Sequence, residues 1–245
     1  MKRRFPAPLI VVAAGAIALM SAAPAFGRSY DVTITDLTEG QPLTPPVVAT
    51  HSGKHPIFEV GSPASVGVRE IAENGNNAPL LAQLAADPFS QISDFTQAGS
   101  GPLVPAGKPG SAMFDDQVSF TIEGSNNAKR LSFASMLICT NDGFTGADSL
   151  RLPGGLGKTK TKVTNGYDAG TEINTEDYAD IVPPCQGLIG DMSTEGDPGT
   201  GVSNPALAEG GVIHHHEGIL GVDDLEPAIH GWTDPVAQIE IERTD

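Results

Sequence analysis

Alternation of hydrophobic and polar residues marks several short stretches of this chain. In Ser29–Asp36, the residues Tyr30, Val32 and Ile34 alternate with polar positions, which is the period of a strand with one buried face. The same reasoning predicts further strands at Gln117–Ile122, Gly211–His216 and Asp234–Arg243. In the last of these, Val236, Ile239 and Ile241 mark the expected inner face, although the alternation is imperfect at Gln238.

The stretch Arg130–Cys139 begins with alternation and then becomes apolar on both faces, which is typical of a central strand. The preceding residues 124–130 (GSNNAKR) predict a hairpin connection. Residues 47–60 predict two short extended runs around His51–His55, and the Gly-, Ser- and Pro-rich Phe89–Gly110 predicts a loop, as does Gly187–Asn204.

A different spacing occurs in Ser65–Leu84, where apolar residues recur three and four positions apart. Ser65 can cap a first short helix, and Asn77 with Pro79 can start a second. Many short strands and few helices predict an all-β fold, an antiparallel β-sandwich with one or two short peripheral helices.

The N-terminus has the pattern of a secretory signal peptide over residues 1–27. Lys2, Arg3 and Arg4 precede an apolar run and then small residues, with cleavage expected after Ala25 or Gly27. A buried N-terminal helix is the alternative. Residues 28–245 remain as a single expected domain, in which no stretch is long and apolar enough to span a bilayer.

Charge and cysteine content indicate which ligands the protein favours and in which compartment it occurs. Three of the 14 basic residues lie in the predicted signal peptide, so the rest of the chain has 11 basic and 30 acidic residues and a formal net charge of −19. Such a surface repels nucleic acid and attracts cations, although acidity also keeps an exported protein soluble. Two cysteines in an exported chain predict the disulfide Cys139–Cys185, with two buried free thiols as the alternative.

Three carboxylates have a spacing that suits a metal ion. Asp142 follows the predicted central strand, and Asp168 and Glu172 lie four residues apart around Gly170, which lets the backbone bend. Calcium takes six to eight oxygen ligands, and three carboxylates could anchor it. The spacing alone favours a solvated acidic loop over a metal site.

The histidine-rich residues 214–216 offer another candidate site. On a strand, His214 and His216 share a face and could bind a transition metal, with a third ligand not placed; a polar strand face is the alternative. Nucleophile motifs such as G-x-S-x-G are absent, so no catalytic residues are expected, although a glycosidase carboxylate pair leaves no sequence trace. We expect Trp232 to pack in the core or a turn rather than form a binding platform.

Three blocks of sequence resemble a known family. TNDGFTGADSL followed by YDAGTE, the earlier THSGKHPIFEVGSPASVGVREIAENG, and the closing EGGVIHHHEGILGVDDLEPAIHGWTDPVAQIEI are similar to the spondin N-terminal domain and its bacterial secreted members. The resemblance implies an antiparallel β-sandwich with one bound calcium. Its metal carboxylates correspond to Asp142, Asp168 and Glu172, where Glu172 replaces the Asp of the animal proteins.

Taken together, these observations predict a secreted module, extracellular or periplasmic, with calcium as its cofactor. Its expected role is adhesion or recognition of a surface, matrix or glycan ligand that the sequence does not identify, without binding nucleic acid. The alternatives are an uncharacterised secreted hydrolase, or a structural cell-envelope protein with a transition metal at His214 and His216.

Overall fold

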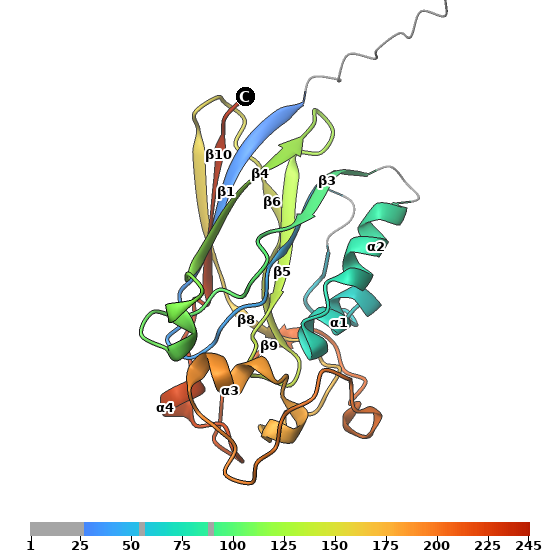
Figure 1. The fold of residues 1–245 in the computed structure, drawn as a ribbon. Coiled ribbons are helices and arrows are strands. Elements are labelled where there is room, and N and C mark those ends of the chain that lie inside the picture. The colour runs from blue at the N-terminus through green and yellow to red at the C-terminus, as the bar shows by residue number, and fades with distance from the viewer. Residues whose placement is uncertain (1–26, 54–56, 88–90) are drawn as a thin grey trace, which may run out of the picture.

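Two antiparallel sheets form the body of the molecule in a computed structural model that describes residues 27–53, 57–87 and 91–245 (Figure 1). The four-stranded sheet has the order β4 (Gln117–Gly124), β1 (Arg28–Asp36), β10 (Ala237–Arg243) and β7 (Thr159–Thr164). The six-stranded sheet has the order β3 (Ile92–Gln97), β2 (Val47–His51), β5 (Arg130–Met136), β6 (Gly143–Arg151), β8 (Gly166–Asp168) and β9 (His214–His215). The predicted all-β sandwich is confirmed.

Short helices lie outside the two sheets. The α-helices are α1 (Val66–Asn74), α2 (Ala78–Ala86), α3 (Pro184–Ile189) and α4 (Pro227–His230), and the 3-10 helices are η1 (Pro109–Ala112), η2 (Tyr178–Asp180) and η3 (Pro205–Leu207). Helices α1 and α2 lie along the six-stranded sheet, whereas α3 and α4 lie at the end of the sandwich where β8 and β9 are found (Figure 1).

The central strand β5 of the six-stranded sheet is buried on both faces. Leu131 and Phe133 pack into a cluster shared with the four-stranded sheet. Ala134 and Met136 pack into a second cluster that contains residues of α1 and α2. This double burial explains why β5 has apolar side chains on both of its faces.

The two longer helices start where the sequence predicts, the first with a side-chain cap and the second without one. The Ser65 side chain accepts a hydrogen bond from the Val68 amide at 3.2 Å, which satisfies one free donor of α1. Asn77 precedes α2, but its side chain does not cap the helix. The side-chain amide nitrogen donates instead to the Pro45 carbonyl at 2.8 Å. Pro79 lies in the first turn, where its missing N–H costs nothing.

Three sequence predictions need correction. Residues 124–130 are not a hairpin turn, because β4 and β5 belong to different sheets and this segment crosses between them. The predicted loop Phe89–Gly110 contains β3, an edge strand whose side chains are mostly half-buried, so hydrophobic alternation there is weak. Of the two extended runs predicted around His51–His55, one is β2, residues 54–56 lie outside the described residues, and residues 57–60 form no strand.

The predicted signal peptide, residues 1–27, lies outside the described residues except for Gly27. Across the described parts of the chain, no helix combines the length and hydropathy that a bilayer crossing requires.

A disulfide joins Cys139, in the turn after β5, to Cys185 in α3. The predicted pairing is therefore confirmed, and the alternative of two free thiols is wrong. The bridge spans a sequence separation of 46 residues. By the chain-entropy argument, a loop of this length stabilises the fold by about 4 kcal/mol.

Asp36 ends β1 with a buried carboxyl group. Its Oδ1 accepts a hydrogen bond from the Thr38 amide at 2.8 Å, whereas Oδ2 has no hydrogen-bond partner among the described residues. Burial, with a smaller contribution from Asp116, raises the pKa of Asp36 to about 8. The carboxyl group is therefore protonated in the folded protein at neutral pH.

We expect Asp36 to make stability decrease with rising pH. Its stabilising contribution should be complete below about pH 4 and should be lost as pH rises through about 8, because the folded state binds this proton more tightly than the unfolded chain. Urea unfolding from pH 4 to 9 measures the slope. Asp36→Asn should flatten it, whereas Asp31→Asn, at an exposed position of the same strand, should leave it unchanged. An equal slope in wild type and Asp36→Asn would contradict this assignment.

Candidate functional site

A tight turn between β5 and β6 positions Asp142. The Thr140 hydroxyl donates to the Leu137 carbonyl at 2.7 Å and accepts from the Gly143 amide at 2.9 Å. A Cβ at Gly143 would lie 2.4 Å from the Thr140 Oγ1, so a larger residue would displace the Thr140 side chain that holds the turn. The turn therefore holds Asp142 in one place, with its side chain completely buried.

Asp168 ends the neighbouring strand β8 and lies beside this turn. Asp168 pairs with Gly143 across β6 and β8, and the Ala169 amide donates to the Asp142 carbonyl at 3.1 Å. The Asp168 carboxylate accepts from the Gly170 amide and from the Asn174 side chain, each at 2.7 Å. The fold thus brings the first two predicted metal ligands together.

Residues 170–172 wrap around the Asp142 carboxylate. Its Oδ2 accepts from the Thr171 amide at 2.7 Å, the Glu172 amide at 3.0 Å and the Thr171 hydroxyl at 3.1 Å. Gly170 adopts the left-handed conformation, with φ of 69°, as the predicted bend requires. Glu172 is thereby next to Asp142 through its backbone.

The Glu172 carboxylate extends toward a different loop. Its Oε1 accepts from the Asn204 amide at 2.8 Å, and the side chain lines a cavity of about 300 Å³ together with Glu73 and Ser203. Asp168 pairs with Gly143, the neighbour of Asp142, so these two predicted ligands lie together, whereas the Glu172 carboxylate is bound by the Asn204 amide. Among the described residues, the predicted set of three does not bring its carboxylate oxygens within 4.8 Å of one another.

The electrostatics of these carboxylates are unfavourable without a cation. The pKa of Asp142 is raised to about 7, first by burial and then by the charge of Asp168, against the opposing hydrogen bonds from Thr171 and Glu172. The pKa of Glu172 is also raised to about 7, mainly by burial, with contributions from Glu73 and Asp142. The Asp142 Oδ1 is buried and lacks a hydrogen-bond partner among the described residues. A hard cation would satisfy this oxygen, so the residues present fit calcium chemically.

His214 and His216, the predicted second metal site, differ in burial: His214 is exposed and His216 is buried. His214 pairs with Asp168 across β8 and β9, and its Nδ1 lies 3.7 Å from the Asp168 Oδ1 and 3.0 Å from the Val212 carbonyl. Burial alone would lower the pKa of His214, but the Val212 carbonyl and the Asp168 charge together raise it.

His216 is buried, and burial lowers its pKa. Its Nδ1 accepts a hydrogen bond from the Gly218 amide at 3.0 Å, so in the neutral ring the proton is on Nε2. A protonated Nε2 has no lone pair for a metal. Coordination through Nε2 would move the ring proton to Nδ1 and break the hydrogen bond from the Gly218 amide. This cost disfavours the predicted transition-metal site.

His215 and His216 contact the segment that contains Trp232. His215 Nε2 is hydrogen-bonded to the Asp234 carboxylate, whose other oxygen accepts from the Gly166 amide at 3.0 Å. The His216 ring meets the Trp232 ring edge-to-face, with centroids 5.0 Å apart. A Cβ at Gly166 would lie 3.0 Å from the Trp232 Nε1, so this glycine allows the indole to approach β8 closely.

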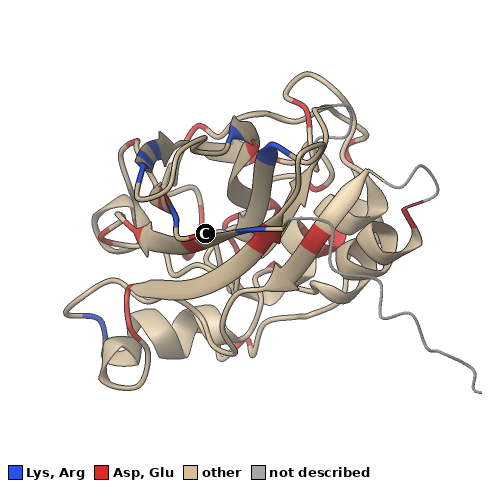
Figure 2. Cartoon of the chain, turned by 90° about the horizontal axis from the view of Figure 1, so that it is seen from above, with Lys and Arg blue, Asp and Glu red and all other residues tan. Residues whose placement is uncertain are grey.

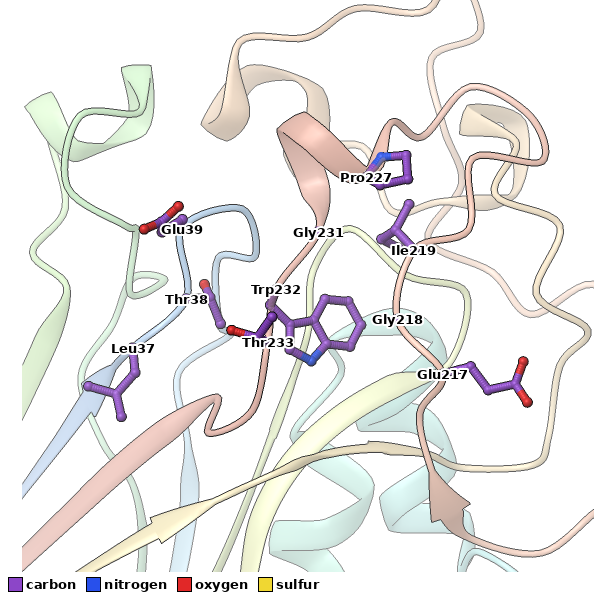
Figure 3. Close-up of a pocket in the computed structure, with 10 residues that line it drawn as sticks. All are labelled: Leu37, Thr38, Glu39, Glu217, Gly218, Ile219, Pro227, Gly231, Trp232 and Thr233. Atoms are coloured by element: carbon purple, nitrogen blue, oxygen red, sulfur yellow. The ribbon is translucent and has the colours of Figure 1, made fainter.

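Trp232 lines a surface cavity of about 400 Å³ (Figure 3). The other lining residues are residues 37–39, residues 217–219, Pro227, Gly231 and Thr233. The sequence expectation placed Trp232 in the core or a turn. The side chain does pack against both hydrophobic clusters, but it also contributes to this cavity.

Glu176 is a buried carboxylate that sequence reasoning missed. It accepts hydrogen bonds from three consecutive amides, those of Leu220, Gly221 and Val222, at 2.6, 2.7 and 2.8 Å. Its φ of 59° is unusual for a residue other than glycine and is compensated by these bonds. No periodicity around Glu176 signals this role, because its partners lie more than 40 residues away.

A separate acidic cluster was also not predicted. Asp177, Asp197 and Asp224 bring carboxylate oxygens within 4.8 Å of one another, and all three side chains are half-buried. Each already accepts a hydrogen bond, from the Ala179 amide, the Ser193 hydroxyl and the Tyr178 amide respectively.

Acidic positions outnumber basic ones across the whole fold, as Figure 2 shows. The full chain has 30 acidic and 14 basic residues. The surroundings of both the carboxylates and the Trp232 cavity therefore favour cations over anions.

Comparison with known proteins identifies one family. The Spondin_N family model matches residues 38–183, which is more than half of the 245-residue chain. The matched range contains Asp142, Asp168 and Glu172 and ends before β9 and Trp232. No curated protein matches the chain.

Replacing Gly170 should be far more damaging than replacing Gly210. Both glycines are left-handed, with φ of 69° and 67°, so alanine strains the backbone at each. At Gly170, however, the added Cβ would also lie 2.6 Å from backbone atoms of Val212, whereas at Gly210 it meets nothing within 4 Å. We expect Gly210→Ala to cost about 1 kcal/mol and Gly170→Ala at least about 2 kcal/mol more. Urea denaturation measures both, and equal losses would contradict the described packing.

Proposed function

The chain belongs to the spondin N-terminal domain family, and we propose that it is an extracellular recognition module whose end loops are held together by one calcium ion. Family membership supports an extracellular module. The Cys139–Cys185 disulfide supports the same setting, because such bonds persist in oxidising compartments.

The observation that carries the calcium proposal is the unpartnered Oδ1 of Asp142. This oxygen is buried beside Asp168, in a protein where buried polar atoms are nearly always hydrogen-bonded. A divalent cation would supply the missing partner and offset the repulsion between the two carboxylates. The carboxylate and hydroxyl oxygens around Asp142 suit calcium. The nearest described imidazole is that of His214, whose Nδ1 lies 3.7 Å from the Asp168 Oδ1.

Asp142 and Asp168 would hold the ion, and Glu172 would join them as a third carboxylate if its side chain left the Asn204 amide. Calcium contributes charge neutralisation here and takes part in no reaction. Its expected effect is to fasten the β5–β6 turn to residues 168–172, which lie on a separate segment of the chain. The fastened loops would then present a fixed surface at this end of the sandwich.

Recognition of a surface, matrix or glycan ligand is the second part of the proposal. Sandwich folds carry binding residues on loops at the ends of a rigid scaffold. The long loops that follow β8 lie at the end of the sandwich near β8 and β9 (Figure 1). Asp168 ends β8, and the Trp232 cavity is lined by residues that follow β9.

Calcium should bind and stabilise the protein through Asp142. At free calcium 100 times the dissociation constant, the folded state should gain about 2.7 kcal/mol. Isothermal titration calorimetry and thermal unfolding measure binding and stabilisation. Asp142→Asn should abolish both effects, because it removes the charge at the centre of the site while keeping its size.

Two control variants separate this site from other acidic groups. Asp177→Asn alters the cluster of Asp177, Asp197 and Asp224 but can still cap η2, and Asp115→Asn alters an exposed carboxylate. Both should bind calcium like the wild type. If the binding heat survives Asp142→Asn and disappears in Asp177→Asn, the ion occupies the other cluster and the proposal fails.

Retention on a ligand surface should depend on the same ion. We expect the wild-type protein to bind cells or a glycan array in calcium and to be released by a chelator, and Asp142→Asn to bind weakly in both conditions. Retention unchanged by the chelator would show that calcium plays no part in recognition.

A further inference from the structure

The cavity beside Trp232, called here the Trp232 cavity, is built from three segments far apart in the chain. Residues 37–39 follow β1, residues 217–219 follow β9, and Pro227 with residues 231–233 precede β10. Most of this lining lies beyond residue 183, outside the range matched by the family model. At about 400 Å³ the cavity has the size of a small-molecule site.

Trp232 is held firmly in this cavity before any ligand arrives. The edge-to-face contact with His216 and the close approach of Gly166 support the indole from the side of β8. The Asp234 carboxylate accepts from the Gly166 amide of β8 and is hydrogen-bonded to His215 of β9, which fastens the chain after Trp232 to both strands. In Figure 3 the indole ring lies at the centre of the lining residues, between Thr38 and Gly218. A fixed aromatic surface loses little entropy when a ligand binds.

The charged residues of the lining are both acidic. Glu39 and Glu217 are exposed, and neither carboxylate pairs with any residue that the structure describes. Figure 3 shows them on opposite sides of Trp232, with the Glu217 carboxylate turned away from the indole. An exposed side chain without a partner can rotate toward a ligand at little cost.

From this geometry we infer that the Trp232 cavity binds an organic cation, an ammonium or guanidinium group, over the indole ring between Glu39 and Glu217. A cation near the face of a tryptophan is attracted by the ring quadrupole, and the two carboxylates add Coulomb attraction. Among the described residues no Lys or Arg lines the cavity, and the chain has a net charge of −16, so an anionic ligand is disfavoured. This inference rests on the recognition part of the proposed function and does not depend on calcium.

The same geometry gives a role to two histidines of residues 214–216, the segment predicted from the sequence as a candidate metal site. His215 and His216 act as positioning residues for the indole, and neither needs to bind a metal in this role. A neutral sugar could also stack on Trp232, but it would not use the charge of Glu39 and Glu217. The charge dependence of binding therefore distinguishes the two kinds of ligand.

Intrinsic fluorescence tests the inference directly, because Trp232 is the single tryptophan of the chain. The protein is titrated with tetramethylammonium chloride, N-acetyl-lysine methylamide, N-acetyl-arginine methylamide and, as a neutral probe, methyl glucoside, all at constant ionic strength. We expect a saturable change in emission with at least one cation and a weaker response to the neutral probe. The lysine and arginine derivatives distinguish a compact from a planar cation.

Charge-neutral variants test the role of the two carboxylates. Glu39→Gln and Glu217→Gln should each weaken cation binding about fivefold. Glu242→Gln changes an exposed carboxylate near the far end of β10 and should have no effect. Raising the salt concentration should weaken binding in the wild type more than in either glutamine variant.

Two results would overturn the inference. One is the absence of any saturable emission change with all three cations. The other is tighter binding of methyl glucoside that neither glutamine variant alters, which would identify a neutral sugar site. Running every titration in calcium and in a chelator keeps the two proposals separate. If the protein binds the organic cations but shows no affinity for calcium, the calcium proposal is rejected and the inference about the Trp232 cavity stands.

Discussion

The burial of the Asp142 carboxylate is the constraint on which this end of the molecule depends. One of its oxygens takes three hydrogen bonds from Thr171 and Glu172, and the Asp142 carbonyl takes a fourth from Ala169. These bonds join the β5–β6 turn to the segment after β8. The other carboxylate oxygen has no partner among the described residues. Leaving such a group buried costs free energy, which is why a bound cation is the natural complement to this arrangement.

The acidic site and the Trp232 cavity share one scaffold. Asn141, the neighbour of Asp142, accepts a hydrogen bond from the Glu176 amide at 3.3 Å. Glu176 in turn binds the amides of residues 220–222, which directly follow the cavity wall at residues 217–219. From the other side, Asp168 pairs with His214 at the start of the segment that supports Trp232. Short chains of hydrogen bonds thus connect the two sites through the end of the sandwich.

Sequence reasoning succeeded where structure is set by near neighbours in the chain. Alternation located β1, β4 and β10, and the Ser65 cap located α1, because side-chain period and capping are local properties. The turn at residues 124–130 was misassigned because a hairpin and a crossover between sheets use the same polar residues. Edge strand β3 was missed because half-buried side chains need little hydrophobic alternation.

By itself, the sequence determined the all-β class, the two peripheral helices, the pairing of the two cysteines, the family and the carboxylates Asp142, Asp168 and Glu172 as a candidate set. Tertiary structure alone decided how these groups are used. In the folded protein the Glu172 carboxylate binds the Asn204 amide, and Glu176 binds three backbone amides. His216 contacts Trp232, and His215 binds the nearby Asp234. A cavity lies between Glu39 and Glu217. The physical reason is distance along the chain. These contacts join segments separated by 16 residues or more, and no local period or propensity encodes which segments will meet.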